Sequence, residues 1–206
     1  MTGNDYLKHL ADIKGIIERR TKFRALSGLS GILAGVYALT GAFIAHRLIY
    51  AAPRELYQEV QNHVYSPVAI QLLLVAGAVL ASALATGIYF SARNARKMGE
   101  KLWNPAAVKV TGNFAIPMAV GAVFIAAMLY RGHLGLISPA CLLFYGLALI
   151  NAANYTFSDV KTLGLAVLAI GCAALFFQGY GLYFWALGFG VLHLLYGAIM
   201  YFKYEK

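Results

Sequence analysis

The chain has 206 residues, of which 61% are hydrophobic and 12% are charged, and its formal net charge is +9. Soluble domains carry about 25% charged residues, and a soluble fold of this length needs a polar exterior that this composition does not supply. The composition therefore excludes a water-soluble globular domain and predicts an integral membrane protein.

The N-terminal segment, residues 1–24, is polar and basic, and its apolar residues recur at helical spacing. This pattern predicts an amphipathic helix that lies along a membrane surface. The basic residues at its end are candidates for contacts with lipid headgroups: Arg19, Arg20, Lys22 and Arg24. A solvated helix that packs on the rest of the protein is the alternative interpretation.

Residues 25–206 contain six apolar runs of the length that a transmembrane helix requires. The runs cover residues 25–45, 68–91, 114–130, 134–153, 162–177 and 182–202. Because the runs are continuous and do not alternate in polarity, they predict helices and not the strands of a β-barrel. The sequence therefore predicts an all-α, six-helix transmembrane domain that follows an N-terminal amphipathic helix.

Two further helical segments are expected beside the spans. Residues 53–64 follow the first span and begin with Pro53, which suits the first turn of a helix. Residues 91–102 are expected to extend the second helix, with Arg93, Lys97 and Lys101 on one face.

The basic residues predict the orientation. If the N-terminus lies in the cytoplasm, six spans return the C-terminus to the same side. All but three of the 17 Lys and Arg residues then lie on the cytoplasmic side, the exceptions being Arg47, Arg54 and Arg131. This asymmetry follows the positive-inside rule. The sequence thus predicts a multi-pass protein of a bacterial inner membrane, with membrane lipids as partners and no nucleic-acid partner.

Small residues are dense in the first two spans. Gly31 and Gly35 form a GxxxG pair in the first span, and Gly77 and Ala81 repeat the spacing in the second. Small side chains let two helix backbones approach closely in lipid. We expect these four residues to pack helices within the bundle, and a contact within a homo-oligomer is the alternative.

His193 is the most central ionisable residue of any span. Ionisable groups inside a membrane are functional candidates by default. Tyr145, Tyr37 and Ser82 are expected at a similar depth, and with His193 they form a candidate intramembrane polar site. A single interhelical hydrogen bond to a neutral histidine, without further function, is the structural alternative, and the sequence leaves both open.

No motif predicts an enzyme or a bound cofactor. Three histidines and two glutamates are expected on the outer side, but their spacing matches no compact metal-binding motif: His46, His63, His133, Glu55 and Glu59. No span carries a lysine that could bind retinal, and no phosphate loop, HExxH or GxSxG motif occurs. We therefore expect no metal site, no cofactor and no catalytic residues.

Three segments carry a resemblance to a known group of proteins. They read SGLSGILAGVYALTGAF (27–43), GLISPACLLFYGLALINAANYT (135–156) and GYGLYFWALGFGVLHLLYGAIMYFKYE (179–205). With these segments the chain resembles a family of uncharacterised multispan membrane proteins of Bacteroidota, over most of its length. The resemblance implies a bacterial inner-membrane location and transfers no catalytic residues.

Three functions fit these expectations. The first is a channel or facilitator for a neutral or weakly polar small solute, which a bundle with polar groups and no carboxylate inside a span favours. The second is a sensor, scaffold or accessory subunit that acts through its basic N-terminal helix. The third is a lipid-active enzyme. A polar cavity that reaches His193 would favour the first function, and a packed, dry interior would favour the second.

Overall fold

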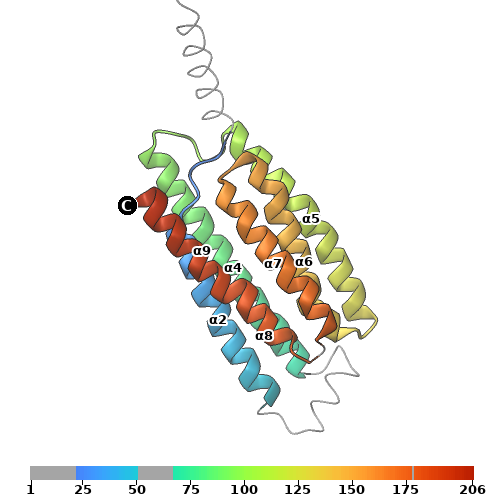
Figure 1. The fold of residues 1–206 in the computed structure, drawn as a ribbon. Helices are drawn as coiled ribbons and strands as arrows, with labels where there is room; N and C mark the ends of the chain where they lie inside the picture. The colour runs from blue at the N-terminus through green and yellow to red at the C-terminus, as the bar shows by residue number, and fades with distance from the viewer. Residues whose placement is uncertain (1–21, 51–66, 178) are drawn as a thin grey trace, which may run out of the picture.

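The computed structural model describes residues 22–50, 67–177 and 179–206, which form a bundle of long helices (Figure 1). Six helical segments are long and apolar enough to cross a membrane, and the described ranges contain no strand. The segments are α2 (Gly28–Tyr50), α4 (Pro67–Lys97), α5 (Pro105–Tyr130), Leu134–Tyr155, α7 (Ser158–Phe176) and Gly181–Glu205. The all-α, six-span fold predicted from the sequence is confirmed, and the chain is a multi-pass membrane protein.

Two of the six segments are composite. The fourth consists of the 3₁₀ turn η1 (Leu134–Leu136), α6 (Ile137–Ala152) and the 3₁₀ turn η2 (Ala153–Tyr155). The sixth, which we call the last helix, consists of α8 (Gly181–Trp185), the π-helical turn η3 (Ala186–Val191), α9 (Leu192–Met200) and the π-helical turn η4 (Tyr201–Glu205).

Most of the amphipathic helix expected over residues 1–24, and all of the helix expected over 53–64, lie outside the described residues. Residues 22–27 are described and are not helical. The first span therefore begins at Gly28, three residues later than expected.

The connection between α4 and α5 differs from the expectation. We expected α4 to continue through residue 102, but the helix ends at Lys97. It ends there because Gly99 adopts a φ of +68°, a backbone conformation that favours glycine and stops a helix. The next helix then begins at Pro105, nine residues before the expected start. Asn104 caps it by accepting a hydrogen bond from the Ala107 amide at 2.8 Å, and a proline suits the first helical position. The apolar-run criterion missed this start because Lys109 interrupts the run.

The core lies between α6 and α7. Buried aliphatic side chains of these two helices form its centre: Leu142, Leu149, Val160, Leu163 and Val167. The helix backbones also approach closely there, since a Cβ built on Gly146 would lie 2.9 Å from the Gly164 carbonyl oxygen. Seven of the 16 residues of α6 are buried, against three of the 26 residues of α5. The α6 helix is thus central, and α5 is an outer helix.

The packing of the helices follows a simple order. The α6 helix packs on both α5 and α7, the last helix packs on α7 and α2, and α2 packs on α4. Along its length α4 packs mainly on α2, which leaves large apolar side chains exposed, for example Leu74 (67%) and Ile88 (59%). Exposed apolar surface of this extent is expected of helices that face lipid.

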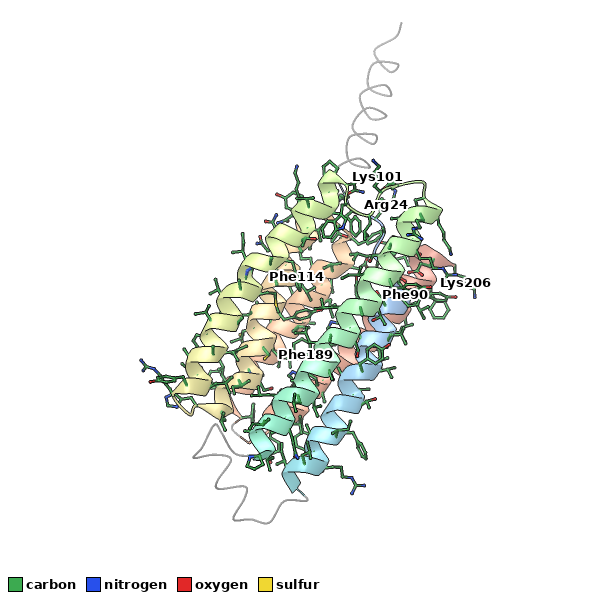
Figure 2. The ribbon with its side chains drawn as sticks, turned by 180° about the vertical axis from the view of Figure 1, so that it is seen from behind. Arg24, Phe90, Lys101, Phe114, Phe189 and Lys206 are labelled. Carbon is green, nitrogen blue, oxygen red and sulfur yellow. The ribbon has the colours of Figure 1, made fainter. Side chains whose placement is uncertain are left out.

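One end of the bundle carries most of the positive charge of the described residues, and we call it the basic end. Arg24 and Lys101 lie there together, with Lys206 close to the same end (Figure 2). Residues 22–27, which we call the entry segment, lead into α2. Phe23 of this segment forms a small core at this end with Ala95 of α4 and with Ala106 and Ala107 of α5. The opposite end holds Arg47, in the last turn of α2, and Arg131, which caps the end of α5.

Candidate functional site

The mid-span candidate His193 belongs to α9, directly after the π-helical turn η3. Its Nδ1 atom lies 3.0 Å from the Gly188 carbonyl oxygen, five residues earlier. Because a carbonyl oxygen only accepts hydrogen bonds, Nδ1 carries the proton and donates it. Nε2 of the neutral ring is then an acceptor, and it lies 2.7 Å from the Tyr145 hydroxyl of α6.

The hydrogen-bonding capacity of this histidine is therefore complete. Both ring nitrogens have partners within the protein, and the residue is only 6% exposed. No buried side-chain nitrogen or oxygen atom among the described residues lacks a hydrogen-bond partner. In hydrocarbon such pairing removes the cost of an unsatisfied polar group.

Aromatic rings surround the Tyr145–His193 pair. The Tyr145 ring lies 5.8 Å from Phe114 of α5 in an edge-on arrangement and 5.0 Å from Phe189 of η3. Phe189 in turn stacks on His193 at 6.1 Å. Phe114 and Phe189 both lie between α5 and α4 in the view of Figure 2. Rings from α5 and from the last helix thus flank the pair, which restricts its rotation.

The other two members of the expected polar site lie elsewhere. Ser82 is on the exposed face of α4, and its carbonyl oxygen accepts a local hydrogen bond from Thr86. Tyr37 is half-buried in α2, and no hydrogen bond to His193 is found for it within the described part of the chain. The structure therefore brings together only His193 and Tyr145 of the four residues.

The small residues of α2 lie against the last helix. A Cβ built on Gly31 would lie 3.1 Å from Gly197 Cα, and one built on Gly35 would lie 2.8 Å from the Gly190 carbonyl oxygen. The two backbones can approach this closely only because side chains are absent there.

Gly77 and Ala81 make no such contact, which corrects the packing role expected for them within the bundle. Both are exposed on α4, and a Cβ on Gly77 would meet nothing within 4 Å. The reason is that α4 packs on α2 through a different face, so this row of small residues points away from the bundle. A contact with a second copy of the chain stays a prediction.

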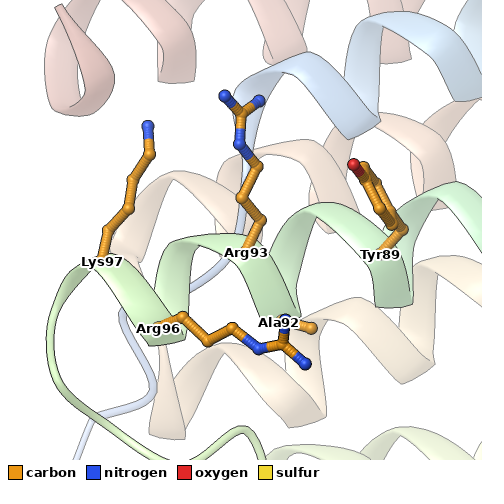
Figure 3. A pocket seen from close by; sticks show the side chains of 5 residues that line it. All are labelled: Tyr89, Ala92, Arg93, Arg96 and Lys97. Carbon is orange, nitrogen blue, oxygen red and sulfur yellow. The ribbon is translucent and has the colours of Figure 1, made fainter.

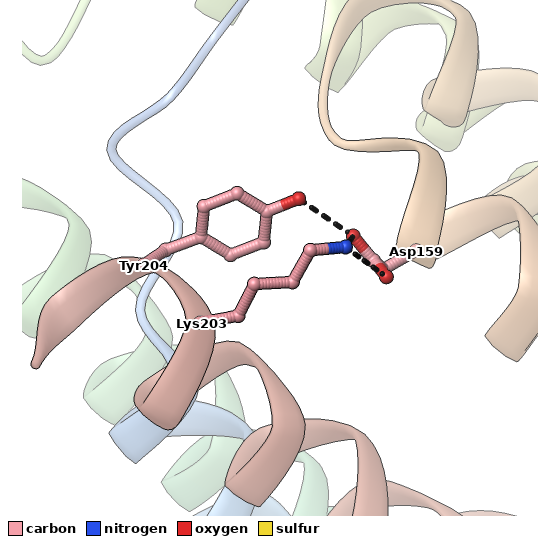
Figure 4. Close-up of polar contacts among 3 residues, drawn as sticks. All are labelled: Asp159, Lys203 and Tyr204. Atoms are coloured by element: carbon pink, nitrogen blue, oxygen red, sulfur yellow. Dashed lines mark hydrogen bonds and ion pairs between the residues drawn. The ribbon is translucent and has the colours of Figure 1, made fainter.

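At the basic end, the last turn of the chain connects three helices. Lys203 Nζ donates hydrogen bonds to both carboxylate oxygens of Asp159 in α7, at 3.0 and 3.1 Å, and the Tyr204 hydroxyl donates to one of them at 2.8 Å (Figure 4). Glu205 accepts hydrogen bonds from the Gly28 amide and from the Ser27 hydroxyl at the start of α2. A carboxylate at a helix N-terminus is favourable because it satisfies free amides and meets the positive end of the helix dipole.

The entry segment is fixed at the same end. The Phe23 amide donates to the Tyr155 carbonyl oxygen, and the Thr156 hydroxyl donates to the Phe23 carbonyl oxygen, both at 2.8 Å. Of the expected headgroup contacts, Lys22 and Arg24 flank this anchor and are exposed, whereas Arg19 and Arg20 lie outside the described residues.

Two hollows open on the surface. One, of about 570 Å³, lies on the final turns of α4 and is lined by Tyr89, Ala92, Arg93, Arg96 and Lys97 (Figure 3). The other, of about 390 Å³, lies at the opposite end and is lined by aromatic and aliphatic residues around the α7–α8 connection: Phe177, Tyr180, Tyr183, Phe184 and Leu187. Neither of these hollows includes His193. The sequence indicated the basic face of α4, but it did not indicate the hollow.

The outer His and Glu residues, whose spacing matches no metal-binding motif, do not form a metal-binding group within the described residues. His46 lies beside Tyr183, whose hydroxyl is 3.5 Å from its Nε2 atom, while His133 precedes η1 at the end of α5. His63, Glu55 and Glu59 lie outside the described residues. Within the described ranges no group of three His, Cys, Asp or Glu residues could hold a metal ion.

Comparisons with known proteins identify no relative of this chain. The chain matches no family model, no curated protein and no solved structure.

Proposed function

We propose that the protein is a membrane-embedded scaffold or accessory subunit and not a solute channel. The observation that carries this proposal is the closed hydrogen bonding of His193, the most central ionisable group. A solute pathway through a membrane needs polar groups that can exchange partners with the solute. Here both ring nitrogens are occupied by Tyr145 and Gly188, aromatic rings surround them, and neither surface hollow reaches the pair.

Permeability of liposomes tests this proposal directly. The full chain would be reconstituted into liposomes, and the uptake of glycerol and urea would be followed by stopped-flow light scattering. We expect the same rates as in empty liposomes of the same size. An acceleration that grows with the protein-to-lipid ratio would contradict the proposal.

A facilitator for a small neutral solute is the second candidate. It is favoured by the π-helical turn η3, because such turns are frequent at functional sites, and this one lies directly beside the polar pair. In this case the same liposomes would take up solute faster, and Tyr145→Phe would change the rate.

The orientation and location belong to the same proposal. The basic end faces the cytoplasm of a bacterial inner membrane, which is supported by the distribution of Lys and Arg and by the resemblance to multispan proteins of Bacteroidota. The N-terminal segment 1–24 then provides the cytoplasmic contact with a partner or with headgroups.

Deletion of residues 1–22 tests this contact. We expect the truncated chain to insert in the membrane, because the six spans remain, but to migrate as a smaller species than the full chain in native electrophoresis of gently solubilised membranes. If the two chains differ only by the mass removed, the segment binds no protein partner, and the partner contact is contradicted in favour of the contact with headgroups.

A further inference from the structure

The hollow on α4 combines a cationic wall with an aromatic edge. Tyr89, Arg93 and Lys97 follow each other at intervals of four residues and project from the same side of the helix, while Arg96 and Ala92 project from another side (Figure 3). The volume of about 570 Å³ lies in the range of sites that hold small ligands. Three cationic side chains thus line one hollow.

These three cations have no acidic partner among the described residues. The described part of the chain contains three Asp and Glu side chains, and each is engaged elsewhere. Asp159 binds Lys203 and Tyr204, Glu205 caps α2, and Glu100 accepts a hydrogen bond from Asn104. Arg93, Arg96 and Lys97 therefore present a net positive charge that an external anion can neutralise.

The exposed apolar residues beside the hollow favour an anion that also has an apolar part. Within the preceding turns of α4 the helix exposes Leu84 (53%), Ile88 (59%) and Tyr89 (64%). Toward the start of α4, exposed small residues precede Tyr89 on the same side of the helix at intervals of four residues: Ala85, Ala81 and Gly77. Apolar surface and cationic hollow therefore adjoin on one helix, and the tyrosine marks the boundary where such rings are enriched. A free phosphate would use only half of this surface.

We infer that the hollow binds the phosphodiester headgroup of an anionic phospholipid. The Arg93 guanidinium donates hydrogen bonds to the phosphate oxygens, since guanidinium matches phosphate in a two-pronged geometry, and Arg96 adds positive charge from the adjacent side of the helix. Lys97 adds a point charge and the Tyr89 hydroxyl donates at the glycerol level. The acyl chains run along the exposed face of α4, past Ile88 and Leu84.

The test compares lipid binding by the full chain and by two matched variants. One variant replaces the cations of the hollow (Arg93→Gln, Arg96→Gln and Lys97→Gln). The control replaces three exposed lysines of the basic end that do not line the hollow (Lys101→Gln, Lys109→Gln and Lys161→Gln). Native mass spectrometry of the detergent-solubilised proteins would measure the affinity for phosphatidylglycerol and for phosphatidylcholine. Glycerol 3-phosphate would serve as the soluble anion.

We expect the wild-type chain and the control to prefer phosphatidylglycerol, and the hollow variant to lose roughly a hundredfold in affinity for it. Equal losses in the two variants would show unspecific attraction by the basic end, and an unchanged hollow variant would show that no site exists there. Either result overturns the inference.

Two further measurements keep the inference testable if a variant folds poorly. If glycerol 3-phosphate displaced phosphatidylglycerol with an affinity equal to that of the lipid, the site would bind a soluble anion, and the inference would be contradicted. This measurement needs only the wild-type chain. The single substitution Arg96→Gln, in an exposed side chain, should weaken phosphatidylglycerol binding about fivefold. No loss in this variant would count against the inference.

Discussion

At the residue scale, the most informative feature is the pairing of His193 with Tyr145. The sequence indicated His193 because it is the most central ionisable residue, and it offered three partners at similar depth. Depth follows from position along an apolar run, but the choice among the three depends on how each helix is rotated. Ser82 was a wrong candidate because its side of α4 faces away from the bundle.

The substitution Tyr145→Phe tests the value of this hydrogen bond. It keeps the ring that packs on Phe114 and Phe189 and leaves Nε2 of His193 without a donor. We expect the stability to fall by about 1–2 kcal/mol, measured by titrating the solubilised protein with sodium dodecyl sulfate. The control Tyr37→Phe removes a hydroxyl that makes no bond to His193 and should change stability by less than about 0.5 kcal/mol. Equal effects would contradict this assignment.

A second residue-scale prediction concerns Gly→Ala substitutions in α2 and α4, which we expect to change the stability in opposite directions. A new methyl group on Gly35 would lie 2.8 Å from backbone atoms of the last helix, which cannot move aside cheaply. Gly35→Ala should therefore destabilise the bundle by about 1–3 kcal/mol.

Gly77→Ala is its matched control, because it adds the same methyl group to open space. It should be neutral or stabilising by up to about 1 kcal/mol, since alanine favours the helix. The midpoint of unfolding in the same detergent titration measures both variants. A loss of stability in Gly77→Ala would show that this side of α4 is packed, as in a contact between two copies.

At the element scale, the last helix forms hydrogen bonds both in the interior, around His193, and at the basic end, to two other helices. Its π-helical turn η3 places the Gly188 carbonyl oxygen within reach of His193, and its final turn η4 brings Lys203, Tyr204 and Glu205 to two other helices. The sequence predicted a span here from the uncharged run. It could not predict the π turns, because they change the local hydrogen bonding without changing the apolar pattern.

Glu205→Ala tests the role of this final turn. The substitution removes the carboxylate that caps α2 through the Gly28 amide and the Ser27 hydroxyl. We expect about 0.5–2 kcal/mol less stability and faster hydrogen exchange at the first amides of α2. The control Glu100→Ala removes a carboxylate of the same end that bonds only to Asn104, and it should leave exchange in α2 unchanged. Unchanged exchange in the Glu205 variant would contradict the capping role.

At the scale of the whole molecule, the six spans could be predicted because their length is set by the thickness of the hydrocarbon layer. The neighbours of each helix could not be predicted, because interior and lipid-facing surfaces are both apolar. Gly35 and Gly77 illustrate this limit, since both belong to rows of small residues in apolar runs but have opposite environments. The sequence did not predict the basic hollow of α4 for a related reason. The distribution of charged residues indicates the side of the membrane, but the folded helix surface decides which of them line one hollow.

The most direct test of the account is the labelling of single cysteines in intact cells. In a background with Cys141→Ala and Cys172→Ala, one cysteine would replace Arg131 at the end of α5 and another, in a separate chain, Lys101 at the basic end. A membrane-impermeant maleimide would then be added before and after permeabilisation. We predict that Arg131→Cys reacts in intact cells and that Lys101→Cys reacts only after permeabilisation. Labelling of Lys101→Cys in intact cells, or of neither position before permeabilisation, would contradict the orientation on which the proposed cytoplasmic contact rests.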